Sequence, residues 1–474
     1  MNLNQLTIIQ AKEGLREKKF SSVELTKACL EQIEKHNPTL NAFITVCKDG
    51  ALAAARHADE LINNGTIEQL NNYPLLGIPV ALKDLFSTKG INTTAGSKVL
   101  ENYIPPYDAT VVKKLKDAGA IIIGKTNLDA WAHGSSGENS DFDPTKNPWN
   151  TEYVPGGSSS GSAAALAADM CIASTGTDTG GSIRLPASFC NVVGLKPTYG
   201  RVSRNGIVAM ASSLDSIGHF TKTVEDSALM LSVTAGADPL DATTPPIKIP
   251  DYTQQLKKRI KGLKIGIPKE YFIAGLDPKV KTAVEKTIKN LEKEGAETVE
   301  ISLPHTEYAN ACYYIVMADE VSSNLARYDG IRYGNNRGAF GEEAKRRIML
   351  GTYTLSAGYY DAHYKKAMQV RTLLKKDFED AFTNVDTIIT PVSPTLPWKL
   401  GEKMNDPLSM YLSDIFTVTA NLVGIPGLSV PIDFVDCLPT GIQILGPQFS
   451  EGLLFQIGYT IEQATEWHTM KPKL

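Results

Sequence analysis

Apolar residues recur at helical spacing through residues 1–70 of the chain. Residues 6–19 form one amphipathic stretch, and Ser21-Ser22-Val23-Glu24 offers a capping box before a second stretch. We expect that second helix to stop at Asn37-Pro38, because proline interrupts the helical hydrogen bonds. A third helical pattern covers about residues 50–63. This part of the chain is therefore predicted to be helical.

Strand and helix patterns alternate after residue 70. Residues 74–83 contain a short apolar run between prolines, which predicts a buried strand ending at Lys83. Helix-to-strand steps follow at three places, which is typical of α/β architecture. The predicted strands are residues 120–123, 263–267, 297–301, 387–390, 427–430 and 441–445, and the predicted helices are residues 109–118, 277–293, 356–382 and 451–464.

One stretch resembles a linker between domains. It is the proline-rich run Pro245-Pro246-Ile247-Lys248-Ile249-Pro250. Strand patterns continue on both sides of it at similar spacing, so we interpret it as a crossing loop within one large domain.

The composition narrows the classes of function. The 474 residues carry a net charge of −4 and no run of Lys and Arg interleaved with aromatics, which argues against a strong nucleic-acid surface. No apolar run approaches the ~18 residues of a membrane span, and we expect a cytoplasmic protein without membrane contact. The six cysteines and seven histidines show neither zinc nor disulfide spacing, so no metal site is predicted.

Two clusters of glycine and serine carry the candidate chemistry. They are Gly156-Gly157-Ser158-Ser159-Ser160-Gly161-Ser162 and Thr177-Asp178-Thr179-Gly180-Gly181-Ser182-Ile183-Arg184. Glycines beside Ser182 would let backbone N–H groups converge on a carbonyl oxygen, which amide cleavage requires. No histidine lies nearby, so a buried lysine with a lowered pKa is the candidate base. Lys83 is best placed, and the Ser158 hydroxyl could relay the proton.

Other interpretations of these motifs carry less weight. Residues 119–126 match the P-loop pattern, but a predicted helix precedes them and β-branched strand formers fill the gap between the glycines. Ser159 fits the G-x-S-x-G elbow of α/β-hydrolases, which also needs a later acid and histidine. His219 and His305 are available, although neither has a distinctive setting. A glycine-serine cluster can also be a plain flexible loop.

The clusters resemble the amidase signature family. The resemblance rests on residues 156–165, 177–184 and 188–197 and spans nearly the whole chain. It implies an α/β fold over residues 1–474, with a mixed sheet of about eleven strands between helices. Within this single domain, residues 1–70 are N-terminal helices, residues 71–220 form the signature core, and residues 250–474 carry specificity residues.

The resemblance also implies a Ser-Ser-Lys triad that cleaves amides. Ser182 is then the nucleophile, Lys83 the base, and Ser158 the bridging serine after a cis peptide bond. The backbone amides of the Ser182 turn form the implied oxyanion hole, namely those of Thr179, Gly180, Gly181 and Ser182.

The second half of the chain resembles one branch of this family. Residues 313–314, 322–334, 345–351 and 358–361 are similar to the A subunits of glutamyl-tRNA(Gln)/aspartyl-tRNA(Asn) amidotransferases. This branch implies glutamine hydrolysis, with Arg347 on the α-carboxylate, Asp414 on the α-ammonium and Tyr313 adding a hydroxyl contact. From the residues alone, Arg347 and Asp414 would be surface charges.

The same branch implies a set of partners. The B and C subunits of the amidotransferase would complete a heterotrimer, and a partner would hold ATP and magnesium and contact the tRNA. No cofactor is expected in this chain. Whether Glu-tRNA(Gln), Asp-tRNA(Asn) or both accept the ammonia stays open. Two alternatives also remain: a free-standing amidase acting on another small amide, and a catalytically silent assembly protein.

Two positions depart from the branch. The segment of residues 335–344 is shorter than expected, which puts partner contacts there in doubt. His133 stands where methionine is expected, and this change could alter the pocket wall or the ammonia exit.

Overall fold

A single twisted sheet organises the computed structural model, which describes residues 2–272, 275–331 and 334–474. Arg332 and Tyr333, part of one run that resembles the amidotransferases, lie outside the described residues. In the described part, eleven strands pair in the order β1-β3-β2-β4-β6-β5-β10-β11-β9-β7-β8. The strands are β1 Phe43–Val46, β2 Pro79–Lys83, β3 Ile121–Thr126, β4 Ala173–Asp178, β5 Val193–Lys196, β6 Ser216–Thr221, β7 Lys264–Pro268, β8 Glu297–Ile301, β9 Thr387–Pro391, β10 Gly427–Val435 and β11 Leu438–Leu445.

The sheet is mixed and joins both halves of the chain. Strand β2 runs parallel to β3 and β4, whereas β4 and β6 are antiparallel. Antiparallel pairing of β5 with β10 connects strands that precede the proline-rich segment to strands that follow it. The predicted α/β fold with a large mixed sheet is therefore confirmed.

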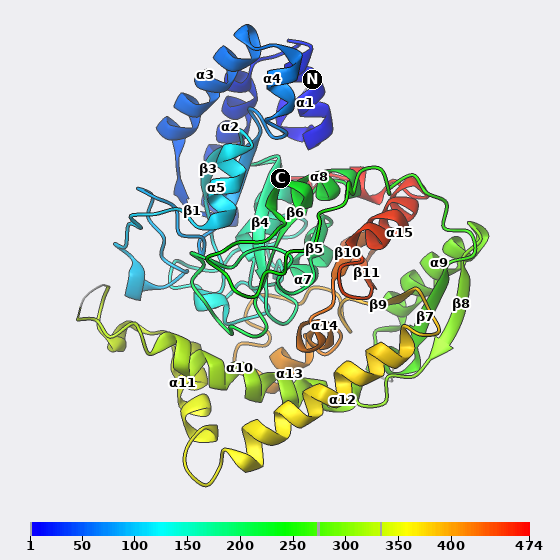
Figure 1. Cartoon of the computed structure of the whole chain (residues 1–474). Helices are drawn as coiled ribbons and strands as arrows, with labels where there is room; N and C mark the ends of the chain where they lie inside the picture. The colour runs from blue at the N-terminus through cyan, green and yellow to red at the C-terminus, as the bar shows by residue number, and fades with distance from the viewer. Residues whose placement is uncertain (1, 273–274, 332–333) are drawn as a thin grey trace.

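Helices surround this sheet (Figure 1). The N-terminal helices α1 to α5 lie at one end of the molecule, and α10 to α12 run along the opposite side. The helices are α1 Ile8–Arg16, α2 Ser22–Leu40, α3 Lys48–Asn64, α4 Ile67–Asn71, α5 Thr110–Asp117, α6 Ser160–Ala167, α7 Arg184–Cys190, α8 Val224–Thr234, α9 Pro278–Lys293, α10 Ala309–Leu325, α11 Glu342–Thr354, α12 Lys366–Ala381, α13 Pro407–Leu412, α14 Val418–Val423 and α15 Glu451–Gln463.

The predicted end of helix α2 is wrong. The Ser21–Glu24 capping box forms as expected, but the helix continues through Pro38 to Leu40. Asn41 closes it in the left-handed conformation, with its N–H donating to the Asn37 carbonyl. Burial of Leu40 favours this last turn, and a proline so near the end disturbs few helical hydrogen bonds.

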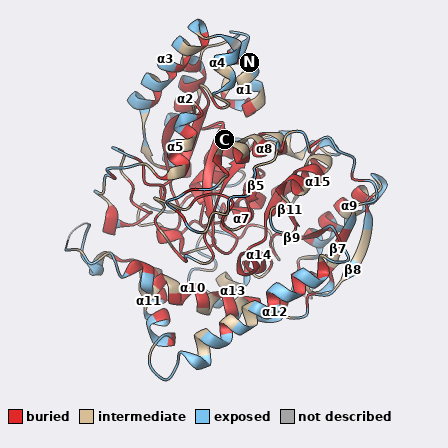
Figure 2. Cartoon of the chain, viewed as in Figure 1, coloured by how far each residue is buried: buried red, intermediate tan, exposed pale blue. Residues whose placement is uncertain are grey.

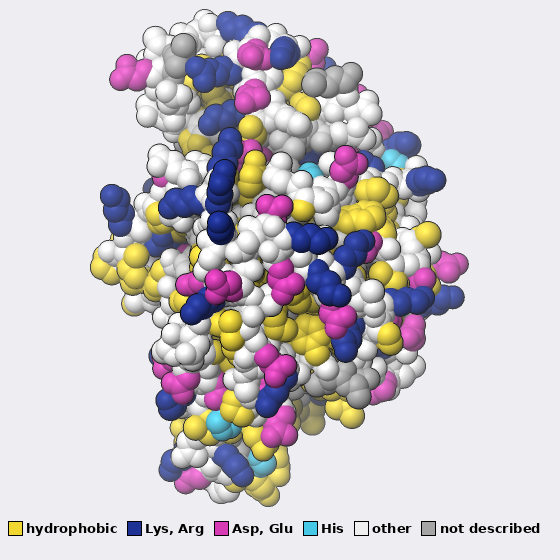
Figure 3. Space-filling model, turned by 90° about the vertical axis from the view of Figure 1, so that its right-hand side faces the viewer, with side chains coloured by type: hydrophobic (Ala, Val, Ile, Leu, Met, Phe, Trp, Pro, Cys, Tyr) yellow, Lys and Arg dark blue, Asp and Glu magenta, His cyan; other side chains and the backbone are white. Residues whose placement is uncertain are grey.

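Burial is concentrated at the centre of the sheet (Figure 2). Every residue of β2 to β6 is buried, while the outer faces of α11 and α12 are exposed. On the face seen in Figure 3, Lys and Arg side chains are interspersed with Asp and Glu. None of the described helices is both long and apolar enough to cross a membrane.

The segment that matches the P-loop pattern is a strand. Residues Ile121–Thr126 form β3, directly after α5. Lys125 is fully buried beside Asp84, with 3.0 Å between Nζ and Oδ1, and it also donates to Thr93. The lysine is therefore committed to the core and unavailable to a phosphate.

Candidate active site

Ser182 lies on the tight turn between β4 and α7. Asp178, the last residue of β4, accepts hydrogen bonds from the N–H groups of Gly181 at 2.9 Å and Ile183 at 3.1 Å. Gly181 has φ +140°, and a side chain there would collide with Thr417. The turn thus requires glycine, both for its backbone conformation and for close packing.

A buried arginine holds the carboxylate that shapes this turn. Arg184 donates to both oxygens of Asp178 and also to Gln443 and Asn421, and its side chain is fully buried. Burial alone would raise the pKa of Asp178, but the Arg184 charge and hydrogen bonds lower that pKa to about 2. Asp178 is therefore ionised at neutral pH and keeps the turn in place.

Lys83 lies at the centre of three hydroxyl groups. Its Nζ atom is 2.8 Å from Ser158 Oγ, 2.9 Å from Ser159 Oγ and 2.8 Å from Thr177 Oγ1. The peptide bond between Gly157 and Ser158 is cis, as the family resemblance implies. All four side chains are buried, so bulk water does not compete for these contacts.

The environment of Lys83 suits a general base. Burial lowers the pKa of Lys83 to about 7, against the opposing charge of Asp129 and of two further aspartates. A neutral amine has two N–H donors and one lone pair. The Ser159 hydroxyl donates to the Thr177 carbonyl at 3.2 Å, so its oxygen is free to accept from Lys83. With Ser159 and Thr177 accepting, the lone pair faces Ser158.

The predicted proton relay lacks one hydrogen bond in the structure, the one between Ser158 and Ser182. Ser182 Oγ has no hydrogen-bond partner among the described residues, although the Ser182 carbonyl accepts from the Ser159 N–H at 3.2 Å. Ser182 is slightly exposed, with 8% of the residue accessible to solvent. Proton transfer between Ser158 and Ser182 stays a prediction, since catalytic hydrogen bonds often tighten only with substrate bound.

The predicted oxyanion hole needs one correction. The Gly181 N–H is already taken by Asp178 Oδ1. The N–H groups of Thr179, Gly180 and Ser182 have no partner among the described residues, so these three are available to a developing oxyanion.

The three predicted substrate residues converge from α10, α11 and the α13–α14 connection. Tyr313 packs against Gly180, where an added Cβ would lie 2.5 Å from the tyrosine hydroxyl. Asp414 accepts from the Ser135 hydroxyl at 2.7 Å and from the Tyr314 hydroxyl at 3.0 Å. Its backbone carbonyl accepts from Thr417, which also bonds the Gly180 carbonyl. Asp414 is therefore linked to the nucleophile turn through the Thr417 hydroxyl.

The pKa values of two of these residues lie above their usual values, for different reasons. Burial raises the pKa of Asp414 to about 6, with Ser135 and Tyr314 acting against it. Arg347 is also buried, yet the Glu343 carboxylate at 2.8 Å raises its pKa above the usual value. At neutral pH the site therefore holds a fixed cation and a carboxylate.

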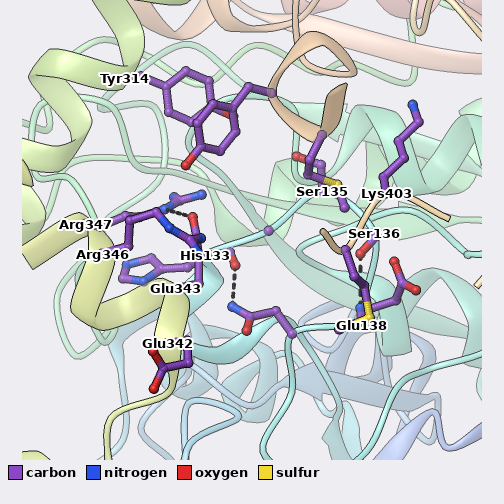
Figure 4. Close-up of a pocket in the computed structure, with 15 residues that line it drawn as sticks. His133, Ser135, Ser136, Glu138, Tyr314, Glu342, Glu343, Arg346, Arg347 and Lys403 are labelled. Atoms are coloured by element: carbon purple, nitrogen blue, oxygen red, sulfur yellow. Dashed lines mark hydrogen bonds and ion pairs between the residues drawn. The ribbon is translucent and has the colours of Figure 1, made fainter. Parts of the chain in front are cut away.

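A cavity of about 170 Å³ opens beside these residues (Figure 4). Arg347 and Tyr314 lie on one side of it, and Ser135 and Lys403 on the other. Ser182 is not part of its lining, but the Ser135 carbonyl accepts from the Gly157 N–H at 2.8 Å, next to the cis peptide. Of the three predicted substrate residues, Arg347 lines the cavity, and Ser135 in its wall connects it to Asp414 and to the residue before Ser158.

The histidine alternative has no support in the structure. His219 bonds Ser227 at 2.8 Å, and His305 pairs with Asp377 at 2.9 Å. The Ser159 hydroxyl instead bonds Lys83 and the Thr177 carbonyl, and it has no histidine partner among the described residues.

Sequence reasoning missed several residues of the site. Thr177, Asp178 and Arg184 fall within the second glycine-serine cluster, but nothing in the pattern assigns them roles. Ser135 and Tyr314 lie beside residues that the resemblance singled out. The only sequence signal for Thr177, Asp178 and Arg184 is that they are polar residues close to Ser182 in the chain.

Comparisons with known proteins agree with this geometry. The sequence model of the family described as Amidase matches residues 24–455. The A subunit of glutamyl-tRNA(Gln) amidotransferase of Carboxydothermus hydrogenoformans is 55% identical over 489 residues, covering 100% of both chains. The same protein of Geobacter metallireducens is 55% identical, covering 99% of each.

Solved structures of amidases are also similar to this chain. The crystal structure of the glutamyl-tRNA(Gln) amidotransferase A subunit from Thermotoga maritima has a TM-score of 0.84 and 43% identity, covering 100% of this chain and 98% of that one. Peptide amidase from Stenotrophomonas maltophilia has a TM-score of 0.82 and 30% identity, covering 97% and 96%. The chain therefore belongs to the amidase family, and within it to the group of glutamyl-tRNA(Gln) amidotransferase A subunits.

Proposed function

We propose that this chain is the glutaminase subunit of a tRNA-dependent amidotransferase. The observation that carries the proposal is the pair of buried charges, Arg347 and Asp414, beside the Ser182 turn. Free glutamine carries an α-carboxylate and an α-ammonium, and a site of this kind can satisfy both. The full-length similarity to proteins named as amidotransferase A subunits supports the same substrate.

The chemistry follows from the positions of the hydroxyl groups. Ser182 Oγ attacks the side-chain amide carbon while its proton passes to Ser158, whose own proton moves to neutral Lys83. The three available N–H groups of the turn stabilise the oxyanion. Collapse of the intermediate breaks the C–N bond as the proton returns to nitrogen, and ammonia leaves. Water then attacks the acyl-enzyme ester and releases glutamate.

The partners belong to the same proposal. We assign the ammonia to a partner that uses ATP and magnesium to amidate Glu-tRNA(Gln), Asp-tRNA(Asn) or both, with a third protein completing the complex in the cytoplasm. The relatives are named as A subunits, which supports an assembly with other chains.

One observation favours a second candidate. Peptide amidase has the same fold and 30% identity, so this scaffold can also serve a free-standing amidase acting on another small amide. Such an enzyme works without partners, and replacing Arg347 leaves activity on its preferred amide nearly unchanged.

The deciding experiment uses the chain co-purified with its partner subunits. Glutamine carrying ¹⁵N in its side-chain amide is supplied together with ATP and each charged tRNA. The proposal predicts ¹⁵N in the aminoacyl-tRNA with the wild type and none with Ser182→Ala. Transfer of ¹⁵N that persists in Ser182→Ala would refute the proposal. If the wild type transfers no ¹⁵N to either tRNA but cleaves another amide rapidly, the free-standing amidase is favoured.

A further inference from the structure

His133 is a buried histidine without a hydrogen bond from its ring. It is fully buried in the wall of the cavity that Arg347 also lines. Neither ring nitrogen has a partner among the described residues. Such an arrangement is uncommon, because a buried polar group left unpaired is destabilising. An unpaired imidazole beside a cavity suggests that a ligand supplies the missing partner.

The charge state of His133 determines what that ligand can offer. Burial, and then the nearby charge of Arg347, lower the pKa of His133 well below its usual value. The ring is therefore neutral at physiological pH and presents one N–H donor and one acceptor nitrogen. A carboxylate oxygen is a suitable acceptor for this N–H.

The backbone holds His133 firmly in this position. The two residues before it, Trp131 and Ala132, have φ of +60° and +64°, which L-residues with side chains rarely adopt. Trp131 N–H donates to the Ala95 carbonyl at 2.8 Å, and the His133 carbonyl accepts from Asn139 at 2.6 Å. Strained backbone of this kind persists where surrounding contacts impose it, often at functional sites.

The neighbours of His133 belong to the proposed substrate site. Figure 4 places it on the same side of the cavity as Arg347 and Glu343 of α11. Two residues further along the chain, Ser135 donates to Asp414. One loop thus carries both His133, with its unpaired imidazole, and Ser135, which bonds the residue predicted to bind the α-ammonium, Asp414. An α-carboxylate held by Arg347 would lie within this group of side chains.

We propose that His133 is a specificity-determining residue that donates a hydrogen bond to the α-carboxylate of an amino-acid substrate held by Arg347. The inference rests on the proposed glutaminase function and deepens it, because it adds a second residue that recognises the free α-carboxylate.

The test compares His133→Met, which keeps the volume and removes the hydrogen bond, with His133→Gln, which can restore a donor. Both variants are prepared in the complex with partner subunits. Hydrolysis of glutamine and of glutamine methyl ester, whose α-carboxylate is blocked, is measured across substrate concentrations. His133→Met is expected to raise KM for glutamine about 10- to 150-fold, the effect of one hydrogen bond to a charged carboxylate, with little change in kcat. The ratio of kcat/KM for glutamine to kcat/KM for the ester falls by a similar factor in His133→Met. His133→Gln restores part of this ratio.

Thermal unfolding with and without glutamine separates this role from a structural one. Without ligand, His133→Met keeps or raises Tm, because it removes unpaired groups, whereas its glutamine-induced rise in Tm is smaller than that of the wild type. His219→Met is the matched control: it removes a buried histidine that has a partner, Ser227, so it lowers Tm without ligand and keeps the glutamine-induced rise.

Three results would overturn the role of His133. These are an unchanged KM and ester preference in His133→Met, a loss of ligand-free Tm as large as that of His219→Met, and no recovery in His133→Gln. A wild-type complex that neither binds nor hydrolyses glutamine would instead refute the proposed function itself, so the two failures are distinguishable.

Discussion

Glutamine hydrolysis should depend on pH through Lys83. The lysine must be neutral to accept a proton from Ser158, and its pKa is about 7. At that pKa the neutral fraction is about nine-tenths at pH 8 and about one-tenth at pH 6. We therefore expect kcat/KM to fall about tenfold between pH 8 and pH 6.

The assay measures ammonia release at glutamine concentrations well below KM, so that the rate reports kcat/KM of the free enzyme. Asp414 should add a second fall in kcat/KM near pH 6, because its pKa is about 6 and protonation removes the charge that binds the α-ammonium. Asp414→Asn removes that titration. This variant is expected to raise KM for glutamine, but the fall in kcat/KM with its midpoint near pH 7 should remain.

Lys83→Met provides the complementary result. Loss of the base should lower kcat by roughly 10²- to 10⁴-fold and remove the pH limb near 7. The assignment of Lys83 as base would be wrong if kcat/KM were flat from pH 6 to 8, or if the midpoint lay above pH 9, near the value of an ordinary lysine.

Three further predictions concern the other parts of the site. Ser158→Ala should lower kcat by roughly 10²- to 10⁴-fold, because it removes the proton relay, and should also lower Tm, because buried Lys83 loses one hydrogen bond; steady-state kinetics and thermal unfolding check this. Arg347→Met should lower kcat/KM for glutamine about 10- to 150-fold through the loss of a charge-assisted hydrogen bond. Lys345→Met, an exposed residue of the same helix, should change it less than about twofold, and equal losses would contradict the assignment. Arg184→Met should reduce the free energy of unfolding by about 3–5 kcal/mol, because it leaves buried Asp178 without its partner; a loss below about 1 kcal/mol in denaturant titration would contradict this account.

Hydrophobic patterning predicted the elements that bury apolar side chains. Strand β2 ends at Lys83 as predicted, although it begins only at Pro79, and the unit from β7 to β8 lies within a residue or two of its predicted position. Patterning missed β4, which consists of small and polar residues and is fully buried. Its hydroxyls find partners in distant segments: Ser174 bonds the Ser162 carbonyl, and Thr175 accepts from the Lys83 N–H. Such tertiary partners leave no local signal in a sequence.

The candidate site was predictable to a similar degree. Glycine content and the lack of a nearby histidine led to Ser182, Ser158 and Lys83 from the residues alone. The roles of Arg347 and Asp414 came only from the family resemblance, because isolated charges in a helix or loop look like surface residues. Their burial depends on contacts between distant segments, such as the packing of α11 on α10 and the hydrogen bond from Tyr314 to Asp414, which no local pattern encodes.

Trapping the acyl-enzyme tests the central claim most directly. The complex is mixed with glutamine and quenched in acid within one turnover, and its peptides are analysed by mass spectrometry. The account predicts one added glutamyl group on the peptide that carries Ser182, and none in Ser182→Ala. A glutamyl group on another residue, or glutamine hydrolysis that persists in Ser182→Ala, would contradict it.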